Sequence, residues 1–353
     1  MPKTTIATST ALRDQLDRLA GFAPTAWPVL SLYLDMRPDQ NGRRNYDAFL
    51  RKALPEHSRA LRADARKSFY RDARHIRQYL ETAVPASTRG LALFACAAAD
   101  NFFEAIQLDA SFDMHELFVD AVPHLYPLAR LNDQHPLYAA LLADTNSARL
   151  FVFRLGRRDV HERVTNVKTR RSAIGGWSQA RYRRHCENFH LHHMKEVVAV
   201  LDRVVRAEAI GQIVIAADDA ARPFLMAQLP KHLLDKVACV LHLDINSPEH
   251  IVLAETLEAL RLRDADIDAE RVRAMVGAHA AGGLAVVGPE ATLDALAKGQ
   301  VEELLIGTQP DRIKLAGQLV ARAQQNAARV RFVEDPALLK NVGGVGAILR
   351  FRI

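Results

Sequence analysis

The chain has 353 residues, which is enough for two or three domains with cores of their own. Its composition, 49% hydrophobic and 25% charged, is typical of a globular protein, and no apolar stretch approaches the ~18 residues that span a bilayer. Three cysteines far apart in the sequence indicate neither a disulfide framework nor a metal site. We expect no signal peptide, no membrane contact and a cytoplasmic location.

Residues 1–134 predict an N-terminal α/β domain. A short helix should end at Gly21, and the dense apolar run from Val29 to Met36 predicts a buried strand. A charged helical stretch follows from Arg43 to Thr82, with a break expected near Pro55. Three strand-like runs complete the domain: GLALFACAAA, FFEAIQLD and HELFVDAV. The many basic residues of the helical stretch alternate with acids, so we interpret it as a mostly solvated face, with nucleic-acid contact by part of it as the alternative.

Residues 135–262 predict a second α/β domain. Two strands should join at a turn over Asp144–Ser147, and DVHERVTNV predicts a third strand. Ser178 is the expected N-cap of a long amphipathic helix that runs to Gly211. A strand, a short helix and a strand follow, so the domain should be layered.

A basic stretch separates the third strand from the long helix. It holds seven basic residues, no acidic residue and a central Gly175-Gly176 pair: Arg163, Lys168, Arg170, Arg171, Arg181, Arg183 and Arg184. The whole chain has a net charge of +6, so the rest of the chain is close to neutral. The glycines permit positive φ and a close approach to a partner. We therefore expect these residues to bind a polyanion, the alternative being a solvated Arg-rich loop.

Residues 263–353 predict a C-terminal α/β/α domain, because strand and helix patterns alternate there with glycine at the helix ends. The segments GGLAVVGPEATLDALAKGQVEELLIG and NVGGVGAILRF, in this order, resemble the third domain of archaeo-eukaryotic class-1 release factors and Pelota. GGWSQ, residues 175–179, then falls where that family has its Gly-Gly-Gln loop. The bacterial branch of the family, which includes hibernation factors of the Balon type, is the most similar.

This resemblance implies an RNase H-like middle domain and a C-terminal domain like the kink-turn-binding ribosomal proteins. It implies a monomer that binds the ribosomal A site, with rRNA and peptidyl-tRNA as partners, no cofactor, and EF-Tu or another translational GTPase at the C-terminal domain. Two features depart from the family: Trp177 and Ser178 separate the glycines from Gln179, and residues 1–134 hold no element that would read a stop codon. Codon-specific termination is therefore not expected.

Two functions follow from the loop. In the first, a rescue factor hydrolyses the peptidyl-tRNA ester: Gly175 and Gly176 donate backbone N–H groups to the oxyanion, and Gln179 orients the water. In the second, a hibernation factor occupies the A site without cleavage, and Trp177 stacks on an unpaired base. Packing of Trp177 on its own domain and a Gln179 without a special role are the plainer alternatives.

A metal-dependent nuclease is a third interpretation. Glu187 and His190 have the spacing of a metal pair on a helix, and Asp218-Asp219 follows a strand. No third ligand is evident, so we predict no metal. The histidines at positions 185, 190, 192 and 193 should form a helix face near RNA, and Asp219 should be a helix N-cap.

Overall fold

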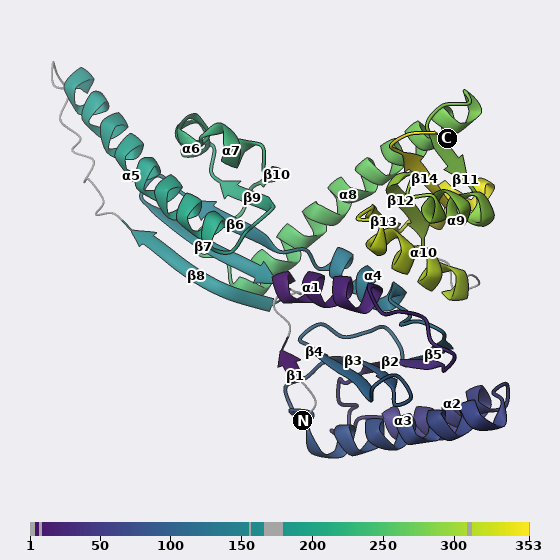
Figure 1. Ribbon diagram of the computed structural model, residues 1–353. Helices are drawn as coiled ribbons and strands as arrows, with labels where there is room; N and C mark the ends of the chain where they lie inside the picture. The colour runs from purple at the N-terminus through teal and green to yellow at the C-terminus, as the bar shows by residue number, and fades with distance from the viewer. Residues whose placement is uncertain (1–3, 7–8, 155–156, 166–178, 309–312, 353) are drawn as a thin grey trace. The chain divides into compact units, whose positions relative to one another are not determined.

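The computed structural model describes residues 4–6, 9–154, 157–165, 179–308 and 313–352 (Figure 1), and the side chains over 12–154, 189–308 and 315–352. The chain forms two compact units. The first joins Met1–His135 to Ile267–Ile353, and the second is Pro136–Asp266. The predicted mixed α/β class is confirmed, because helices and strands alternate along the chain and the strands form three separate sheets. The division into three domains stays a prediction.

The N-terminal part of the first unit is built on a five-stranded sheet with the order β1-β4-β3-β2-β5. The pair β1–β4 is parallel, and the other pairs are antiparallel. The strands are β1 (Thr4–Ile6), β2 (Val29–Asp35), β3 (Gly90–Cys96), β4 (Phe102–Leu108) and β5 (Glu116–Asp120). Strands β2 and β3 are buried almost throughout, which explains their continuous apolar sequences.

Helices cover both faces of this sheet: α1 (Ser9–Ala20) lies above it in Figure 1, and α2 (Tyr46–Ser58) and α3 (Ala63–Thr82) lie below it. Leu50 of α2, with Phe69 and Ile76 of α3, packs on the leucines of β2 and β3. The predicted break of the helical stretch is observed, but a few residues after Pro55, because Pro55 lies inside α2 and the chain turns between Ser58 and Ala63. The Ser58 hydroxyl donates to the Pro55 carbonyl at 2.9 Å and so satisfies an acceptor near the helix end.

A buried carboxylate on α3 makes the stability of this part depend on pH. Asp72 is 2% exposed, and its Oδ1 accepts a hydrogen bond from the backbone N–H of Ala97 at 2.6 Å. Burial raises the pKa of Asp72 to about 6, although the Ala97 hydrogen bond opposes the rise. Since the unfolded value is about 3.9, the native state binds the proton more tightly, and the free energy of unfolding falls as pH rises from about 4 to about 6.

Asp72→Asn should remove this pH dependence and raise the free energy of unfolding above pH 6 by up to about 3 kcal/mol. Urea unfolding at pH 5 and pH 8 measures the effect. The control is Asp64→Asn, because Asp64 is exposed in the first turn of the same helix. It should leave the difference in the free energy of unfolding between pH 5 and pH 8 as it is in wild type. An equal pH dependence in wild type and Asp72→Asn would contradict the prediction.

The C-terminal part of the first unit has a four-stranded sheet with the order β11-β14-β12-β13. Only the β12–β13 pair is parallel. The strands are β11 (Ala285–Val287), β12 (Val301–Gly307), β13 (Arg329–Val333) and β14 (Val345–Leu349). The helices around it are α9 (Pro289–Ala297), α10 (Ile313–Gln325), α11 (Pro336–Leu339) and the end of α8 (Glu249–Ala280).

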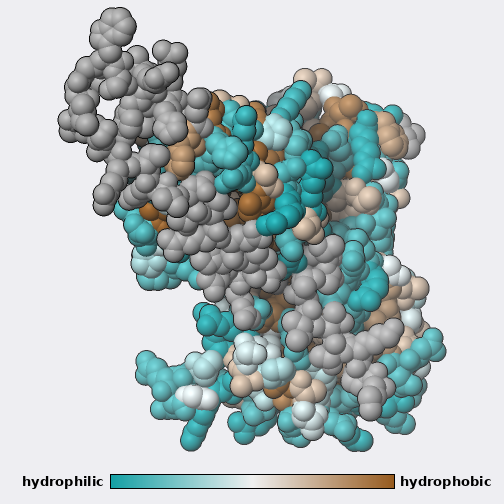
Figure 2. Space-filling view, turned by 90° about the vertical axis from the view of Figure 1, so that its left-hand side faces the viewer, coloured by the Kyte–Doolittle hydropathy of each residue, from teal (hydrophilic) through white to brown (hydrophobic). Residues whose placement is uncertain are grey.

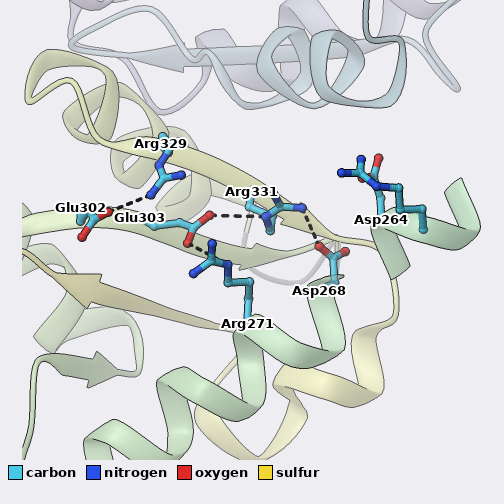
Figure 3. Close-up of polar contacts among 8 residues, drawn as sticks. Asp264, Asp268, Arg271, Glu302, Glu303, Arg329 and Arg331 are labelled. Atoms are coloured by element: carbon cyan, nitrogen blue, oxygen red, sulfur yellow. Dashed lines mark hydrogen bonds and ion pairs between the residues drawn. The ribbon is translucent and has the colours of Figure 1, made fainter. Parts of the chain in front are cut away.

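A network of ion pairs joins α8 to this sheet (Figure 3). Arg331 of β13 donates to Asp268 of α8 at 3.2 Å and to Glu303 of β12 at 3.4 Å. Arg271, one turn along α8 from Asp268, lies 3.8 Å from the other oxygen of Glu303. Asp268 and Glu303 are 5% and 3% exposed, and removal of Arg331 would leave two buried carboxylates without their main partner.

Helix α8 contributes to the cores of both units. Val252 and Leu260 pack in the second unit, whereas Val272 and Met275 pack in the first. At 100° per residue these two pairs point in different directions from the helix axis. Helix α8 therefore shows no single apolar stripe in its sequence, although each half carries residues that are buried in a core.

The two parts of the first unit contact each other through α10. This helix packs against α1 and against α4 (Tyr126–Gln134), a helix that the sequence did not predict. Gln325 of α10 donates to the Ala20 carbonyl at 2.7 Å, and the ring of Tyr126 makes an edge contact with Phe332 at 5.3 Å. Gly317 of α10 lies directly against the ring of His124. The seam thus combines aromatic packing with hydrogen bonds.

The second unit is built on a five-stranded sheet with the order β10-β9-β6-β7-β8. Strands β6, β7 and β8 form an antiparallel meander, and β9 and β10 extend it in parallel from β6. The strands are β6 (Tyr138–Ala143), β7 (Ser147–Arg154), β8 (Arg157–Thr165), β9 (Gln212–Ala217) and β10 (Val237–Leu241). The predicted meander and the later strand–helix–strand alternation are therefore observed.

One face of this sheet is covered by α5 (Gln179–Ala207), α6 (Arg222–Gln228) and α7 (Lys231–Leu234), and the other by the first half of α8. Met194, Leu201 and Val205 of α5 pack on Leu141 and Val152 of the sheet. Within the described part of the chain, no helix is both long enough and apolar enough to cross a membrane.

Candidate nucleic-acid interface

The basic stretch lies between the edge strand β8 and the helix α5. Strand β8 ends at Thr165, and α5 begins at Gln179. Arg163 is in β8, opposite Arg149 of β7, and three arginines occupy the first two turns of α5: Arg181, Arg183 and Arg184. The other predicted site residues lie outside the described residues: Lys168, Arg170, Arg171, Gly175, Gly176, Trp177 and the expected N-cap Ser178.

The structure thus places Gln179 and the three arginines on one helix. For Gly175, Gly176 and Trp177 the predicted roles stay predictions. We call residues 166–178 the β8–α5 connection.

Helix α5 is anchored on the turn between β6 and β7. Asp144 organises this turn: its Oδ1 accepts from the backbone N–H groups of Asn146 and Ser147, both at 2.7 Å, and its Oδ2 accepts from the Ser147 hydroxyl at 3.0 Å. His190 of α5 then contacts the Thr145 carbonyl through Nδ1 at 3.0 Å. Asx turns of this kind fix a loop with local hydrogen bonds. The sequence predicted the turn but not its contact with α5.

His193 is the second anchor. It is fully buried on the inner face of α5, where its ring hydrogen-bonds to the backbone of Ser147. Gln179 lies eleven residues before His190, which is roughly 16 Å of helix. The two histidines therefore hold the middle of α5 on the sheet, and the first turns of the helix extend from this anchor toward the β8–α5 connection.

Protonation should weaken this anchor. Burial lowers the pKa of His193, and the nearby His190 lowers it further, while the Ser147 hydrogen bond, Asp144 and Glu196 oppose the shift. Below the unfolded value of about 6.5, the unfolded state therefore takes up a proton that the native state resists, and stability falls as pH decreases. We expect faster amide hydrogen exchange in the middle of α5 at pH 5.5 than at pH 7.5, after correction for the intrinsic rate.

His193→Gln, which replaces the imidazole with an uncharged amide, should reduce this pH effect. His192→Gln is the matched control, because His192 is an exposed neighbour whose ring lies 3.4 Å from Glu196. A larger loss of pH dependence in His192→Gln than in His193→Gln would overturn the assignment.

The nuclease interpretation gains no support from the described residues. Among them, no three His, Cys, Asp or Glu side chains come together as a metal site requires. His190 is engaged with Thr145, and the side chain of Glu187 lies outside the description. The predicted N-cap role of Asp219 is wrong: Asp218 accepts from the Ala221 N–H at 2.6 Å, whereas Asp219 pairs with Arg222 at 3.1 Å. The side chain of Asp218, not that of Asp219, therefore caps the turn before α6.

Comparison with known families supports the resemblance in the sequence. The model of bacterial archaeo-eukaryotic release factor family 10 matches residues 123–261, a region that contains the whole second unit except its last five residues. No curated protein matches the chain. The resemblance of the C-terminal segments lies outside the matched region and stays a prediction.

Several solved structures are similar at low identity. An archaeal translation termination factor, aRF1, is 18% identical, with 98% of this chain and 99% of its own covered, at a TM-score of 0.30. Dom34 of S. cerevisiae is 11% identical, with coverages of 75% and 79% and a TM-score of 0.46. Archaeal Pelota, from a model of ribosome-bound Pelota and ABCE1, is 15% identical, with coverages of 97% and 94% and a TM-score of 0.43.

Over residues 123–261 the chain is similar to the bacterial archaeo-eukaryotic release factors, as its sequence indicated.

Proposed function

We propose that this chain is a translation factor that binds the ribosomal A site and directs the β8–α5 connection toward the peptidyl-transferase centre. The family match carries this proposal, because residues 123–261 include both the connection and the helix that follows it. The charge of the region supports it: seven cations and no carboxylate between Arg163 and Cys186 suit a surface of RNA phosphates.

The architecture of the second unit is consistent with the expected RNase H-like domain. Three antiparallel strands in a meander, extended by two parallel strands on the side of the first strand, give the order β10-β9-β6-β7-β8. The edge strand β8 and the long helix α5 flank the connection. The N-terminus of α5 offers backbone N–H donors to an anion, and basic residues stand in the sequence on both sides of the connection: Arg163, Arg181, Arg183 and Arg184.

The chemistry that we propose is hydrolysis of the ester of peptidyl-tRNA, which releases the nascent chain. Backbone N–H groups of Gly175 and Gly176 would stabilise the oxyanion, and the Gln179 amide would orient the attacking water. The ribosome supplies the remainder of the catalytic environment. A translational GTPase such as EF-Tu is the partner that we propose for the C-terminal part.

Non-catalytic occupation of the A site is the second candidate. One observation favours it: Trp177 and Ser178 lie between the glycines and Gln179, so the glutamine is displaced by two positions from the family pattern. In this case the protein would protect an empty ribosome, and Trp177 would stack on a base with a contribution of ~1–3 kcal/mol.

Peptide release distinguishes the two candidates. Purified bacterial ribosomes carry labelled peptidyl-tRNA in the P site and an empty A site, and the released peptide and the protein that pellets with the ribosomes are both measured. Release above the rate of ribosomes alone supports hydrolysis. Pelleting without release supports hibernation, and the absence of pelleting at low salt would contradict both.

A further inference from the structure

A second basic surface lies in the N-terminal part, far in sequence from the β8–α5 connection. Residues 43–82 contain eleven Lys and Arg against five Asp and Glu, a net of +6 that equals the charge of the whole chain. Among the described residues, none of these eleven cations forms an ion pair with a carboxylate, whereas arginines elsewhere do, among them Arg18, Arg154 and Arg331. The positive charge here is therefore not neutralised by the protein itself.

The charge gathers on one face of α3. Its inner face holds Phe69, Asp72, Ile76 and Leu80, all buried against the sheet. At 100° per residue, the outer face spans an arc of about 140° and contains Arg66, Lys67, Tyr70, Arg71, Arg74 and Arg77. In Figure 2 teal residues alternate with white and brown ones in the lower part of the view, where Figure 1 places α2 and α3.

The acids of α3 do not interrupt this row. Asp64 and Glu81 lie in its first and last turns, and Asp72 points inward to Ala97. Between Arg66 and Arg77, about 16 Å of helix, the outer face is purely basic apart from one aromatic ring. A row of this length can follow several consecutive phosphates of a polynucleotide.

Two of its residues are already oriented. Tyr70 is 44% exposed, and its hydroxyl lies 3.0 Å from the Ser58 Oγ, which fixes the ring beside the cations. Arg66 donates to the carbonyls of Ser58 and Leu61 at 3.1 and 3.0 Å, so its guanidinium stays at the α2–α3 corner. Four of the five cations are arginines, whose planar guanidinium matches phosphate geometry.

We propose that this outer face of α3 binds RNA through its phosphate backbone, with Tyr70 available to stack on a base. RNA is favoured over an acidic protein because the cations form a straight row that encloses an exposed aromatic ring. The inference concerns a separate surface and does not depend on the β8–α5 connection.

The test uses the full chain and a labelled single-stranded RNA of about 20 nucleotides. The variant carries five substitutions: Arg66→Gln, Lys67→Gln, Arg71→Gln, Arg74→Gln and Arg77→Gln. Glutamine is an adequate helix former, so α3 should persist, and thermal unfolding verifies this. We expect at least tenfold weaker binding, and a shallower slope of log affinity against log salt by two to four units.

The control makes the same change in net charge on exposed cations of the C-terminal part: Lys298→Gln, Arg322→Gln, Arg329→Gln, Lys340→Gln and Arg350→Gln. It should bind within about twofold of wild type. Equal weakening by both variants would overturn the site, and so would unchanged binding by the α3 variant. Polyglutamate of equal charge is the second probe, and if it binds as tightly as RNA, with the same loss in the α3 variant, the RNA assignment is wrong.

A second, charge-preserving variant is used if the glutamine variant is destabilised. If the glutamine variant unfolds at a lower temperature, Arg66→Lys, Arg71→Lys, Arg74→Lys and Arg77→Lys replace it. These changes keep the positive charge but remove the planar guanidinium groups. The slope of log affinity against log salt should therefore persist, while the affinity falls severalfold. No loss of affinity in this variant would contradict arginine-specific phosphate contact. Because free RNA is the ligand, the result is independent of whether the β8–α5 connection enters a ribosome.

Discussion

Gly317→Ala is expected to destabilise the first unit by about 1–3 kcal/mol, although alanine is the better helix former by ~1 kcal/mol. A Cβ at position 317 of α10 would lie 2.3 Å from Nδ1 and 2.4 Å from Cε1 of His124. The His124 ring cannot move aside easily, because it is 2% exposed and stacks on Phe118 with a centroid distance of 3.7 Å. Its Nδ1 also lies 3.4 Å from Asp120.

Gly277→Ala is the matched control. Gly277 also lies inside a helix, α8, but an added Cβ there meets nothing within 4 Å. This variant should be stabilised by roughly 0.5–1 kcal/mol. If Gly317→Ala lowers the free energy of unfolding and Gly277→Ala raises it, contact with His124, not helix propensity, decides the outcome at position 317.

A double-mutant cycle with His124→Ala tests the contact itself. His124→Ala removes the ring that Gly317 approaches. Gly317→Ala should therefore lower the free energy of unfolding by less in the His124→Ala protein than in wild type. Urea unfolding of the four proteins gives the coupling free energy, for which we expect at least about 1 kcal/mol. Additive effects would mean that α10 does not pack on His124 in solution.

Gln179→Ala should slow peptide release by roughly 100-fold if the chain is a hydrolase. Gln179 is the first residue of α5, and the anchor formed by His190 and His193 holds this helix on the sheet. Loss of its amide would remove the group that we propose to orient the water, without a change in the cations that we propose to bind RNA. Pelleting with ribosomes should therefore remain at the wild-type level.

Gly176→Ala should slow release to a similar extent, because a Cβ would obstruct close approach of the backbone to the ester. Gln318→Ala, an exposed glutamine on α10, is the control and should release peptide at the wild-type rate. Wild-type release by both Gln179→Ala and Gly176→Ala would refute the catalytic roles of these residues. Parallel loss of pelleting would instead indicate that the loop serves binding alone.

Much of the secondary structure is readable from local patterns. The predicted strand from Val29 to Met36 matches β2, and the predicted helix from Pro248 to Ala281 matches α8 within one residue at each end. Hydrophobic periodicity and the residues that mark helix ends depend only on neighbouring positions, so both can be identified from the sequence. Helix α4 was missed because its nine residues have a proline near the start and few turns in which a period could show.

The candidate site was only partly readable. The basic composition between Arg163 and Cys186 is a property of the sequence itself, and so is the order of glycines, Trp177 and Gln179. The anchor of α5 was not readable, because His190 meets Thr145 across 45 residues of chain. The predicted histidine face near RNA is wrong for His190 and His193, which contact the β6–β7 turn of the chain's own sheet.

The amino-acid sequence alone was enough to establish the α/β alternation, the two basic segments and the release-factor resemblance, because each of these depends on residue types and their spacing along the chain. Contacts between distant segments required the folded chain: the approach of Gly317 to His124, the ion pairs of Arg331, and the inward turn of Asp72 that leaves a purely basic outer face on α3. Their energies depend on distance and burial in three dimensions, and neither quantity is encoded in any local pattern.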